Sequence, residues 1–270
     1  MARRGVPTVE RDPNEVQSPP MMIPSWGLPG TGSRRTRLLA LLAVRDGMRH
    51  LAGFLRNVAP QVDGIIALDD GSSDGTPELL AQHERVIELL RRPPDRPTWD
   101  EVGNHRSLVA AALRHRAEWV LCIDADERLE RQFRTRAERV IARGRLLGLS
   151  AYAVRLRELW DDRGQFRVDG IWGRKVIARL FRAREDHEFD PSALHGSKAP
   201  TQGRYRGRFP RADLIIYHLG MLRPEDREAR RRRYETADPE RRWQRIGYEY
   251  LTDLRGLTLQ RVAARRTFTD

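Results

Sequence analysis

Two groups of acidic residues follow short apolar runs, at positions where carboxylates could bind a ligand. The first is the DDGSSDGT stretch at residues 69–76, and the second is the DADE stretch at residues 124–127. Two carboxylates separated by one residue at a strand end can converge on one divalent cation, which can in turn bind a diphosphate. The glycines of the first stretch permit close approach of a ligand, and its carboxylates can accept from a base or a ribose. Each stretch also has an ordinary explanation, since Asp/Gly/Ser turns often cap helices and a DxD pair is a common accident.

An open sheet is the element that would bring these two stretches together. Apolar runs precede both of them, at residues 65–68 and 119–123, and two further runs lie at residues 38–44 and 86–90. Helical patterns separate the runs, which gives a β-α-β-α-β order followed by a further helix and strand. Short apolar strands between helices are typical of a parallel sheet covered on both faces, and ligands bind beyond the carboxyl ends of such strands. The sequence therefore predicts an α/β fold with both acidic stretches at one edge of the sheet.

The length and the outer parts of the chain predict one catalytic domain with decorated ends. At 270 residues the chain can form one sizeable core. Further strands are expected near residues 151–156, 176–181 and 214–217, and helices from residue 223 onward. We predict three segments: a disordered, proline-rich segment at 1–36, a catalytic domain at 37–220 and a basic helical extension at 221–270.

The charge of the chain is high but not concentrated. The formal net charge is +12, and 33% of the residues are charged. Nearly all of the cations are arginines, since Lys175 and Lys198 are the only lysines, and the arginines are spread along the whole chain. No helix-turn-helix, zinc or RNA-recognition pattern accompanies them, so we expect no nucleic-acid partner.

The cysteine content and the apolar runs bear on location. Cys122 is the only cysteine, so no disulfide can form within the chain. The longest apolar run, residues 38–44, is far shorter than the roughly 20 residues that cross a bilayer. The N-terminal residues lack the apolar core of a secretory signal. We therefore expect a cytoplasmic protein that is at most peripheral at the inner face of the cell membrane.

The order of the motifs resembles that of the family 2 glycosyltransferases. AVRD at residues 43–46 follows the first strand, DDGSSDGT at 69–76 follows the second and DADE at 124–127 follows the fourth, so that the similarity covers about residues 37–220. The resemblance implies a GT-A fold, in which a Rossmann-like, mostly parallel sheet is flanked by helices. It also implies transfer with inversion from a nucleoside diphosphate sugar, with UDP favoured, held through Mn²⁺ or Mg²⁺.

The resemblance assigns individual residues around the donor. It places Val44 and Arg45 beside the base, and Asp70 on the nucleobase. Asp124 then lies near the ribose and the metal. Asp126 is the direct metal ligand in this assignment.

Two further residues gain a role from the resemblance. Arg106 lies between the second motif and the DxD strand, which favours a place near the nucleotide, although an arginine on the polar face of a helix is usually only solvated. His218 ends an apolar run, where GT-A enzymes often add a late histidine to the metal; by itself it is more typical of a packed histidine. YHLG at residues 217–220 and the Arg/Glu-rich helix that ends in Tyr234 resemble the C-terminal end of bacterial family members that act on cell-envelope glycans.

The general base has two candidates. Inversion in one displacement needs a carboxylate or imidazole to take the proton of the acceptor hydroxyl. Related enzymes tend to show a His-Glu pair after the second-half strands, whereas this chain has His195-Gly196. We therefore keep His195 and Asp169, which lies in the preceding loop, as candidates, and a structural role is an equal alternative for each.

Two other functions stay open beside glycosyl transfer. A sugar-phosphate nucleotidyltransferase shares the sheet topology, but it needs a glycine-rich, arginine-bearing phosphate loop that VRDG at residues 44–47 does not provide. The other is a non-catalytic basic binding protein with a vestigial DxD motif. For the leading function, the expected acceptor is a glycan, a lipid-linked molecule or a small molecule.

The C-terminal extension carries apolar residues at steps of three and four. Trp243, Ile246, Tyr250 and Leu254 predict one apolar stripe on a second helix of the extension. Such a stripe usually packs onto a core, which is the interpretation we favour. The alternative is peripheral membrane contact through residues 221–270, with arginines attracted to anionic lipid and the aromatic rings in the interface.

Overall fold

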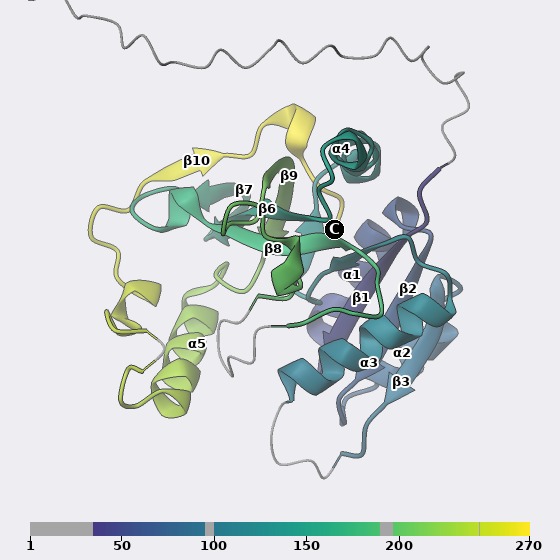
Figure 1. The fold of residues 1–270 in the computed structure, drawn as a ribbon. Helices are drawn as coiled ribbons and strands as arrows, with labels where there is room; N and C mark the ends of the chain where they lie inside the picture. Colours follow the sequence, from purple (N-terminus) through teal and green to yellow (C-terminus); the bar gives the residue numbers. More distant parts are fainter. Residues whose placement is uncertain (1–34, 95–99, 190–196, 243) are drawn as a thin grey trace, which may run out of the picture. The chain divides into compact units, whose positions relative to one another are not determined.

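The computed structural model describes residues 35–94, 100–189, 197–242 and 244–270, whose arrangement is drawn in Figure 1. Most of the segment predicted at 1–36 therefore lies outside the described residues, and only Arg35 and Thr36 belong to it. The residues from Arg35 to Asp270 form one unit by their contacts, so the predicted extension at 221–270 packs as part of the same unit as residues 37–220.

The first half of this unit is a parallel sheet with helices between its strands. The strands are β1 (Leu38–Val44), β2 (Gly64–Asp69), β3 (Val86–Arg91) and β4 (Trp119–Cys122). The helices are α1 (Met48–Val58), α2 (Thr76–Gln82) and α3 (Glu101–Arg114). The strand order is β3-β2-β1-β4, and all three pairings are parallel. The predicted β-α-β-α-β order is confirmed.

The apolar runs form strands because both faces of this sheet are covered. Leu38 of β1 faces one hydrophobic cluster that includes Phe54 of α1, whereas the next residue, Leu39, faces a second cluster that includes Leu108 of α3. Figure 1 shows α3 lying across β1 and β2, in agreement with the contacts of these elements. Burial of each such leucine side chain contributes roughly 1.5–3 kcal/mol. The sheet is therefore rigid where β1, β2 and β4 end.

The second half extends the sheet through antiparallel strands. Its strands are β5 (Glu127–Leu129), β6 (Ala151–Trp160), β7 (Asp162–Arg167), β8 (Val176–Arg182), β9 (Arg211–His218) and β10 (Leu259–Arg261). Its helices are α4 (Phe133–Leu146) and α5 (Pro224–Ala237). β8 joins the two halves by pairing antiparallel to both β4 and β6, and β9 pairs with β5 and, in parallel, with β6. The predicted α/β sheet flanked by helices is confirmed.

The predicted second helix of the C-terminal extension is wrong. Between α5 and β10, the described residues form turns and one short 3₁₀ helix, Glu249–Leu251. Gly247 has a φ of +76°, which interrupts helical geometry between Ile246 and Tyr250. Ile246 and Leu254 are 66% and 56% exposed, and Trp243 lies outside the described residues. Tyr250 alone of the described stripe residues packs inward, with its ring 5.5 Å from that of Trp172. The expected apolar stripe does not form.

The rest of the extension is attached to the sheet at several points. β10 pairs antiparallel with β7, and the aromatic rings of Trp160, Trp172 and Tyr248 form a small apolar cluster between the extension and β6. Near the end of the chain, the backbone carbonyl of Thr269 accepts a hydrogen bond from Asn57 in α1. These contacts support the packed arrangement of residues 221–270.

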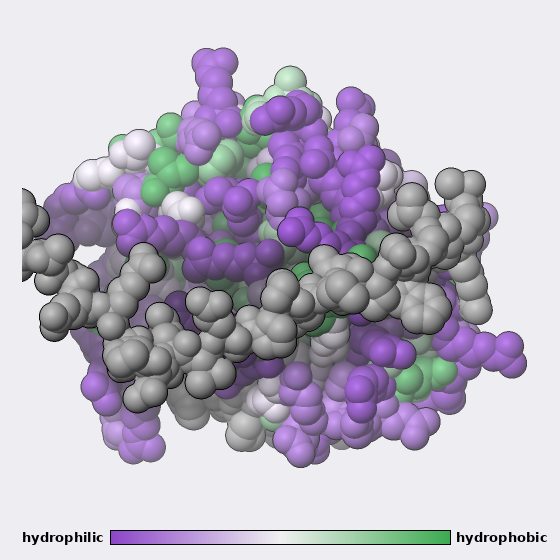
Figure 2. Space-filling view, turned by 45° about the horizontal axis from the view of Figure 1, so that its top comes forward, coloured by the Kyte–Doolittle hydropathy of each residue, from purple (hydrophilic) through white to green (hydrophobic). Residues whose placement is uncertain are grey.

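The surface of the described unit is strongly polar. Figure 2 shows a face on which hydrophilic residues dominate and hydrophobic ones occur in small groups. In the part of the chain that the structure describes, no helix combines the length and the apolar character needed to cross a bilayer.

Candidate functional site

The ends of β1 and β2 bring together three of the predicted donor residues. Val44 pairs with Asp69 at the ends of the two strands, and the carbonyl of Val44 accepts a hydrogen bond of 2.9 Å from the backbone N–H of Asp70. The guanidinium of Arg45 donates to the Asp70 carbonyl at 2.6 Å and to its carboxylate at 3.1 Å. Asp70 is fully buried, whereas Arg45 is half-buried. Val44, Arg45 and Asp70 therefore lie together at the sheet edge.

The other polar residues of the DDGSSDGT stretch hold two loops together. Asp74 accepts from the backbone N–H of Met48 at 3.0 Å and from the hydroxyl of Thr76. In return, the carboxylate of Asp46 accepts from the backbone N–H of Ser73 at 2.8 Å. These bonds fix the loop after β1 against the loop after β2, so most of the motif supports the position of Asp70.

Asp124 follows β4 and lies between two cations. Its carboxylate accepts from the guanidinium of Arg179 at 2.9 Å and from the ammonium of Lys198 at 2.5 Å. Burial alone would raise the pKa of Asp124, but Arg179 and Lys198 outweigh it and hold this pKa well below its usual range. The side chain is about a third exposed, 35%, so it can still reach a ligand.

Strand register brings Asp126 to His218. β5 begins beside the end of β9, where Glu127 pairs with His218, and the backbone N–H of Leu219 donates to the carbonyl of Asp126 at 2.8 Å. As a result, the Nε2 atom of His218 lies 3.0 Å from the Asp126 carboxylate. β6 pairs with the other side of β9 and places Glu158 opposite His218, where its carboxylate contacts Nδ1. The imidazole is thus held between two carboxylates.

Burial and charge set the protonation of this group. Burial alone would lower the pKa of His218, but Glu158 and Asp126 outweigh it and raise this pKa to about 10. Burial would raise the pKa values of both carboxylates, but His218 outweighs it and holds them below their usual range, with Lys175 adding to the effect at Glu158. Glu158 is fully buried and also forms an ion pair with Lys175. The two carboxylates that flank the ring therefore favour its protonated form.

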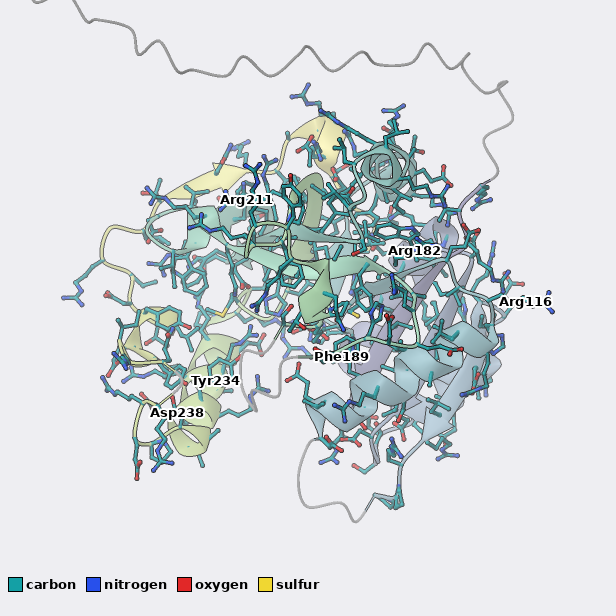
Figure 3. All side chains as sticks on the ribbon, viewed as in Figure 1. Arg116, Arg182, Phe189, Arg211, Tyr234 and Asp238 are labelled. Atoms are coloured by element: carbon teal, nitrogen blue, oxygen red, sulfur yellow. The ribbon has the colours of Figure 1, made fainter. Side chains whose placement is uncertain are left out.

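Helix α5 adds a cation to the same group. The guanidinium of Arg230 lies 3.4 Å from both ring nitrogens of His218 and donates to the hydroxyl of Tyr234 at 3.3 Å. One turn earlier, Arg227 lies over the ring of Trp160 and pairs with Asp161 at 2.8 Å. Both arginines belong to α5, and Figure 3 labels Tyr234 on the same helix. One face of this basic helix therefore contacts the site.

Asp126 and His218 offer an oxygen and a nitrogen atom of the kinds that a divalent cation could bind, and these two atoms contact each other at 3.0 Å. A Cβ atom at Gly220 would approach both ligand atoms to 2.8 Å, so glycine keeps this position open. The contact of Nδ1 with Glu158 is the arrangement that orients metal-bound histidines. Within the described ranges, no group of three or more His, Cys, Asp or Glu side chains is arranged to hold a metal ion.

The remaining candidates lie elsewhere. His195 is outside the described residues. Asp169 follows β7, where Arg167 binds it through two nitrogens and lowers its pKa, and it also accepts from the backbone N–H of Thr258 at 3.1 Å. Arg106 is exposed on α3, next to buried His105, which lines a small cavity together with Asp124. A role for Asp169 as a base would require it to leave these contacts.

The family of the chain follows from its match to a family model. The model described as Glycosyl transferase family 2 matches residues 49–194, more than half of the chain. The chain belongs to glycosyl transferase family 2. The α/β sheet of this family 2 domain agrees with the GT-A type of fold that the motifs implied. The match contains Asp70 and Asp126 but ends before His218.

The relatives of this family 2 chain cover different lengths. Uncharacterised proteins of Mycobacterium tuberculosis and Mycobacterium bovis are each 27% identical over 214 residues, which are 77% of this chain and 52% of theirs. The chain thus spans about half the length of these curated relatives. Among solved structures, S. aureus TarS is similar with 13% identity and a TM-score of 0.48, over 73% of this chain and 38% of that chain. The structure of S. aureus TarS 1-349 in complex with UDP has 11% identity and a TM-score of 0.47, over 80% of this chain and 70% of that chain.

Several residues of the site were missed by the motifs. Glu158, Arg179 and Arg230 belong to no motif, and their contacts depend on strand pairing. The rarity of lysine in the sequence was a signal for two further residues of the site. In a chain whose other cations are all arginines, Lys175 contacts Glu158 and Lys198 contacts Asp124. Both lysines of this family 2 chain therefore lie at the site.

Proposed function

We propose that the chain transfers a glycosyl group from a nucleoside diphosphate sugar, UDP favoured, to a hydroxyl acceptor with inversion, and that it depends on Mn²⁺ or Mg²⁺. The observation that carries the proposal is the group of Asp126, His218 and Glu158 beyond the strand ends. It supplies an oxygen and a nitrogen atom of the kinds that a divalent cation could bind, and it lies beside α5, which adds positive charge. Membership of the family favours this function over a nucleotidyltransferase.

The donor would lie along the edge where β1, β2 and β4 end. In this proposal, Asp70 accepts from the nucleobase beside Val44, and Arg45 fixes the Asp70 carboxylate. Asp124 faces the ribose, and Arg106 lies near the nucleotide. The proposal draws on the cluster of Arg45 and Asp70 and on the partial exposure of Asp124.

The diphosphate would lie near Asp126 and His218. A divalent cation held there would neutralise the charge that develops on the leaving diphosphate. Arg230 is positioned to add positive charge at the same place, since it lies 3.4 Å from His218. Glu158 holds the imidazole so that Nε2 faces Asp126.

The reaction itself is one displacement. The acceptor hydroxyl oxygen forms a bond to the anomeric carbon while the bond from that carbon to the diphosphate oxygen breaks, and the configuration inverts. The hydroxyl proton passes to a base, for which His195 and Asp169 remain the candidates. The acceptor is proposed to be a glycan, a lipid-linked molecule or a small molecule, as in a cell-envelope pathway on the cytoplasmic side.

Thermal stability with a panel of donors tests the proposal. We expect one nucleoside diphosphate sugar among those of UDP, GDP and dTDP to raise the melting temperature, and Mn²⁺ to enlarge the shift. A ligand at 100 times its Kd adds roughly 2.7 kcal/mol of stability. No shift with any donor, with or without Mn²⁺, would instead favour the non-catalytic binding protein.

A further inference from the structure

A groove beside the proposed active site is lined by three cationic side chains, two of which have no carboxylate partner among the described residues. It has a volume of about 890 Å³ and is lined by Arg157, Arg174, Lys175, Ile171 and Gln260 among others, and none of the lining residues is acidic. The groove lies between β6, the loop before β8 and β10. Residue Gln260 comes from the C-terminal segment, so that segment forms part of one wall.

Lys175 pairs with Glu158, but the other two cations that line the groove have no carboxylate partner within the described ranges. Among the described residues, neither Arg157 nor Arg174 takes part in an ion pair, although most arginines around them do. Arg157 is half-buried, and its guanidinium donates to the carbonyl of Gly173 at 2.9 Å and lies over the ring of Phe166. Arg174 is exposed. Two neighbouring guanidinium groups without a carboxylate form a region of positive potential that attracts anionic oxygens.

The wall of the groove is held in place by its own contacts. Asp169 ties the loop to Arg167 and to the backbone N–H of Thr258, which leads into β10. The cationic groups of Arg167 and Lys175 each lie over the ring of buried Trp172, 5.3 and 5.8 Å from its centroid. A groove that is fixed before a ligand arrives loses less entropy on binding.

Lys175 connects the groove to the proposed chemistry. It lines the groove, and its ammonium forms an ion pair with Glu158, which in turn contacts His218. A molecule in the groove is therefore separated from the proposed metal ligands by two side chains. This separation suits an acceptor whose reactive hydroxyl enters the proposed active site while its anionic part stays in the groove.

We propose that this groove binds an anionic part of the acceptor, namely carboxylate or phosphate groups carried by a glycan. The inference rests on the proposed function and names its substrate class. Arg157 and Arg174 contact the anionic oxygens, and Lys175 lies at the end of the groove that faces Glu158.

Binding of small anions without donor tests this inference. The probes are trigalacturonic acid, its neutral trimethyl ester and inorganic tripolyphosphate, titrated at low salt into the full chain and into the Arg174→Gln and Arg182→Gln variants. Arg182 is the matched control, because it is an exposed arginine on β8 that pairs with Trp119, at the far end of β4 from Asp124.

We expect at least one anion to bind and the ester not to bind. Arg174→Gln should weaken the binding about threefold to tenfold, as for loss of one charge-assisted contact, while Arg182→Gln stays within about twofold of the parent. Whether trigalacturonic acid or tripolyphosphate binds more tightly shows whether the groove prefers carboxylate or phosphate groups. Equal weakening by both variants, equal binding of acid and ester, absence of anion binding, or displacement of the anion by UDP would overturn the inference.

The proposed function is measured separately in the same samples. Mn²⁺-dependent UDP binding of the parent and of Arg174→Gln should be equal, since Arg174 is outside the donor site. Absence of anion binding in a parent that binds UDP rejects the groove alone. Absence of UDP binding in the parent rejects the proposed function instead.

Discussion

Replacing Glu158 with glutamine tests how the site holds His218. Glu158 is fully buried and bonds to both His218 and Lys175, so the variant leaves two cationic groups without their shared carboxylate. Removal of one partner of a buried pair costs about 3–5 kcal/mol. At the lower end, about 3 kcal/mol, the melting temperature of a unit of this size falls by roughly 6–12 °C. Loss of the carboxylate that orients a metal-bound histidine lowers metal affinity about 10–100-fold.

The assay is calorimetric titration of UDP with Mn²⁺ into Glu158→Gln and into a matched control, Glu88→Gln. Like Glu158, Glu88 contacts one histidine and one cationic side chain, His115 at 2.9 Å and Arg114 at 2.5 Å. Glu88 lies on β3 and its partners lie at the end of α3, away from the site. We expect the control to bind as the parent does and to lose about 1 kcal/mol or less. Parent-like Mn²⁺-dependent binding in Glu158→Gln would show that Glu158 only stabilises the fold and would refute this reasoning.

Four further changes have distinct expected results. Asp126→Ala should abolish Mn²⁺-dependent UDP binding with the fold intact, and calorimetry that finds it unchanged removes the metal assignment. Asp70→Ala should weaken UDP binding with and without Mn²⁺, because its contact is to the base; parent-like uridine binding contradicts this. Gly220→Ala should reduce the binding of UDP in the presence of Mn²⁺ but not in its absence, because the new Cβ would lie 2.8 Å from the Asp126 oxygen and the His218 nitrogen. Equal loss of UDP binding in both conditions would show that the substitution disrupts the structure of the site in general. Burial lowers the pKa of His105 from 6.5 to about 3, so below pH 6.5 the unfolded chain binds a proton at this residue that the folded chain does not. The free energy of unfolding should therefore fall by about 2 kcal/mol between pH 6.5 and 5. Denaturant titrations should show a smaller fall in His105→Gln.

The parallel half of the fold could be predicted because its signals are local. The apolar runs before Asp70 and Asp124 mark buried strands, and the chain topology of a parallel sheet places their ends at one edge. Asp126 and His218 are 92 residues apart, and only the family resemblance joined them. Their contact depends on the pairing of β5 with β9, for which the sequence offers no local pattern.

The cations and the C-terminal segment were harder to predict. The spacing of Ile246, Tyr250 and Leu254 fits a helix, but Gly247 adopts a left-handed conformation and the short segment is held by tertiary contacts to Trp172. Glu158 is a single acid within the mostly apolar strand β6, which is a signal of a buried, paired charge. Its partner could not be chosen from the sequence, because several arginines were equally available.

Release of UDP from a UDP-sugar tests the central claim most directly. Purified chain is incubated with the donor that gives the largest thermal shift, and UDP is measured with Mn²⁺, with excess chelator, and in Asp126→Ala. The proposal predicts UDP release that requires Mn²⁺ and is lost in the variant, while the variant keeps the melting temperature of the metal-free parent within a few degrees. Release that continues unchanged in chelator and in Asp126→Ala would contradict it.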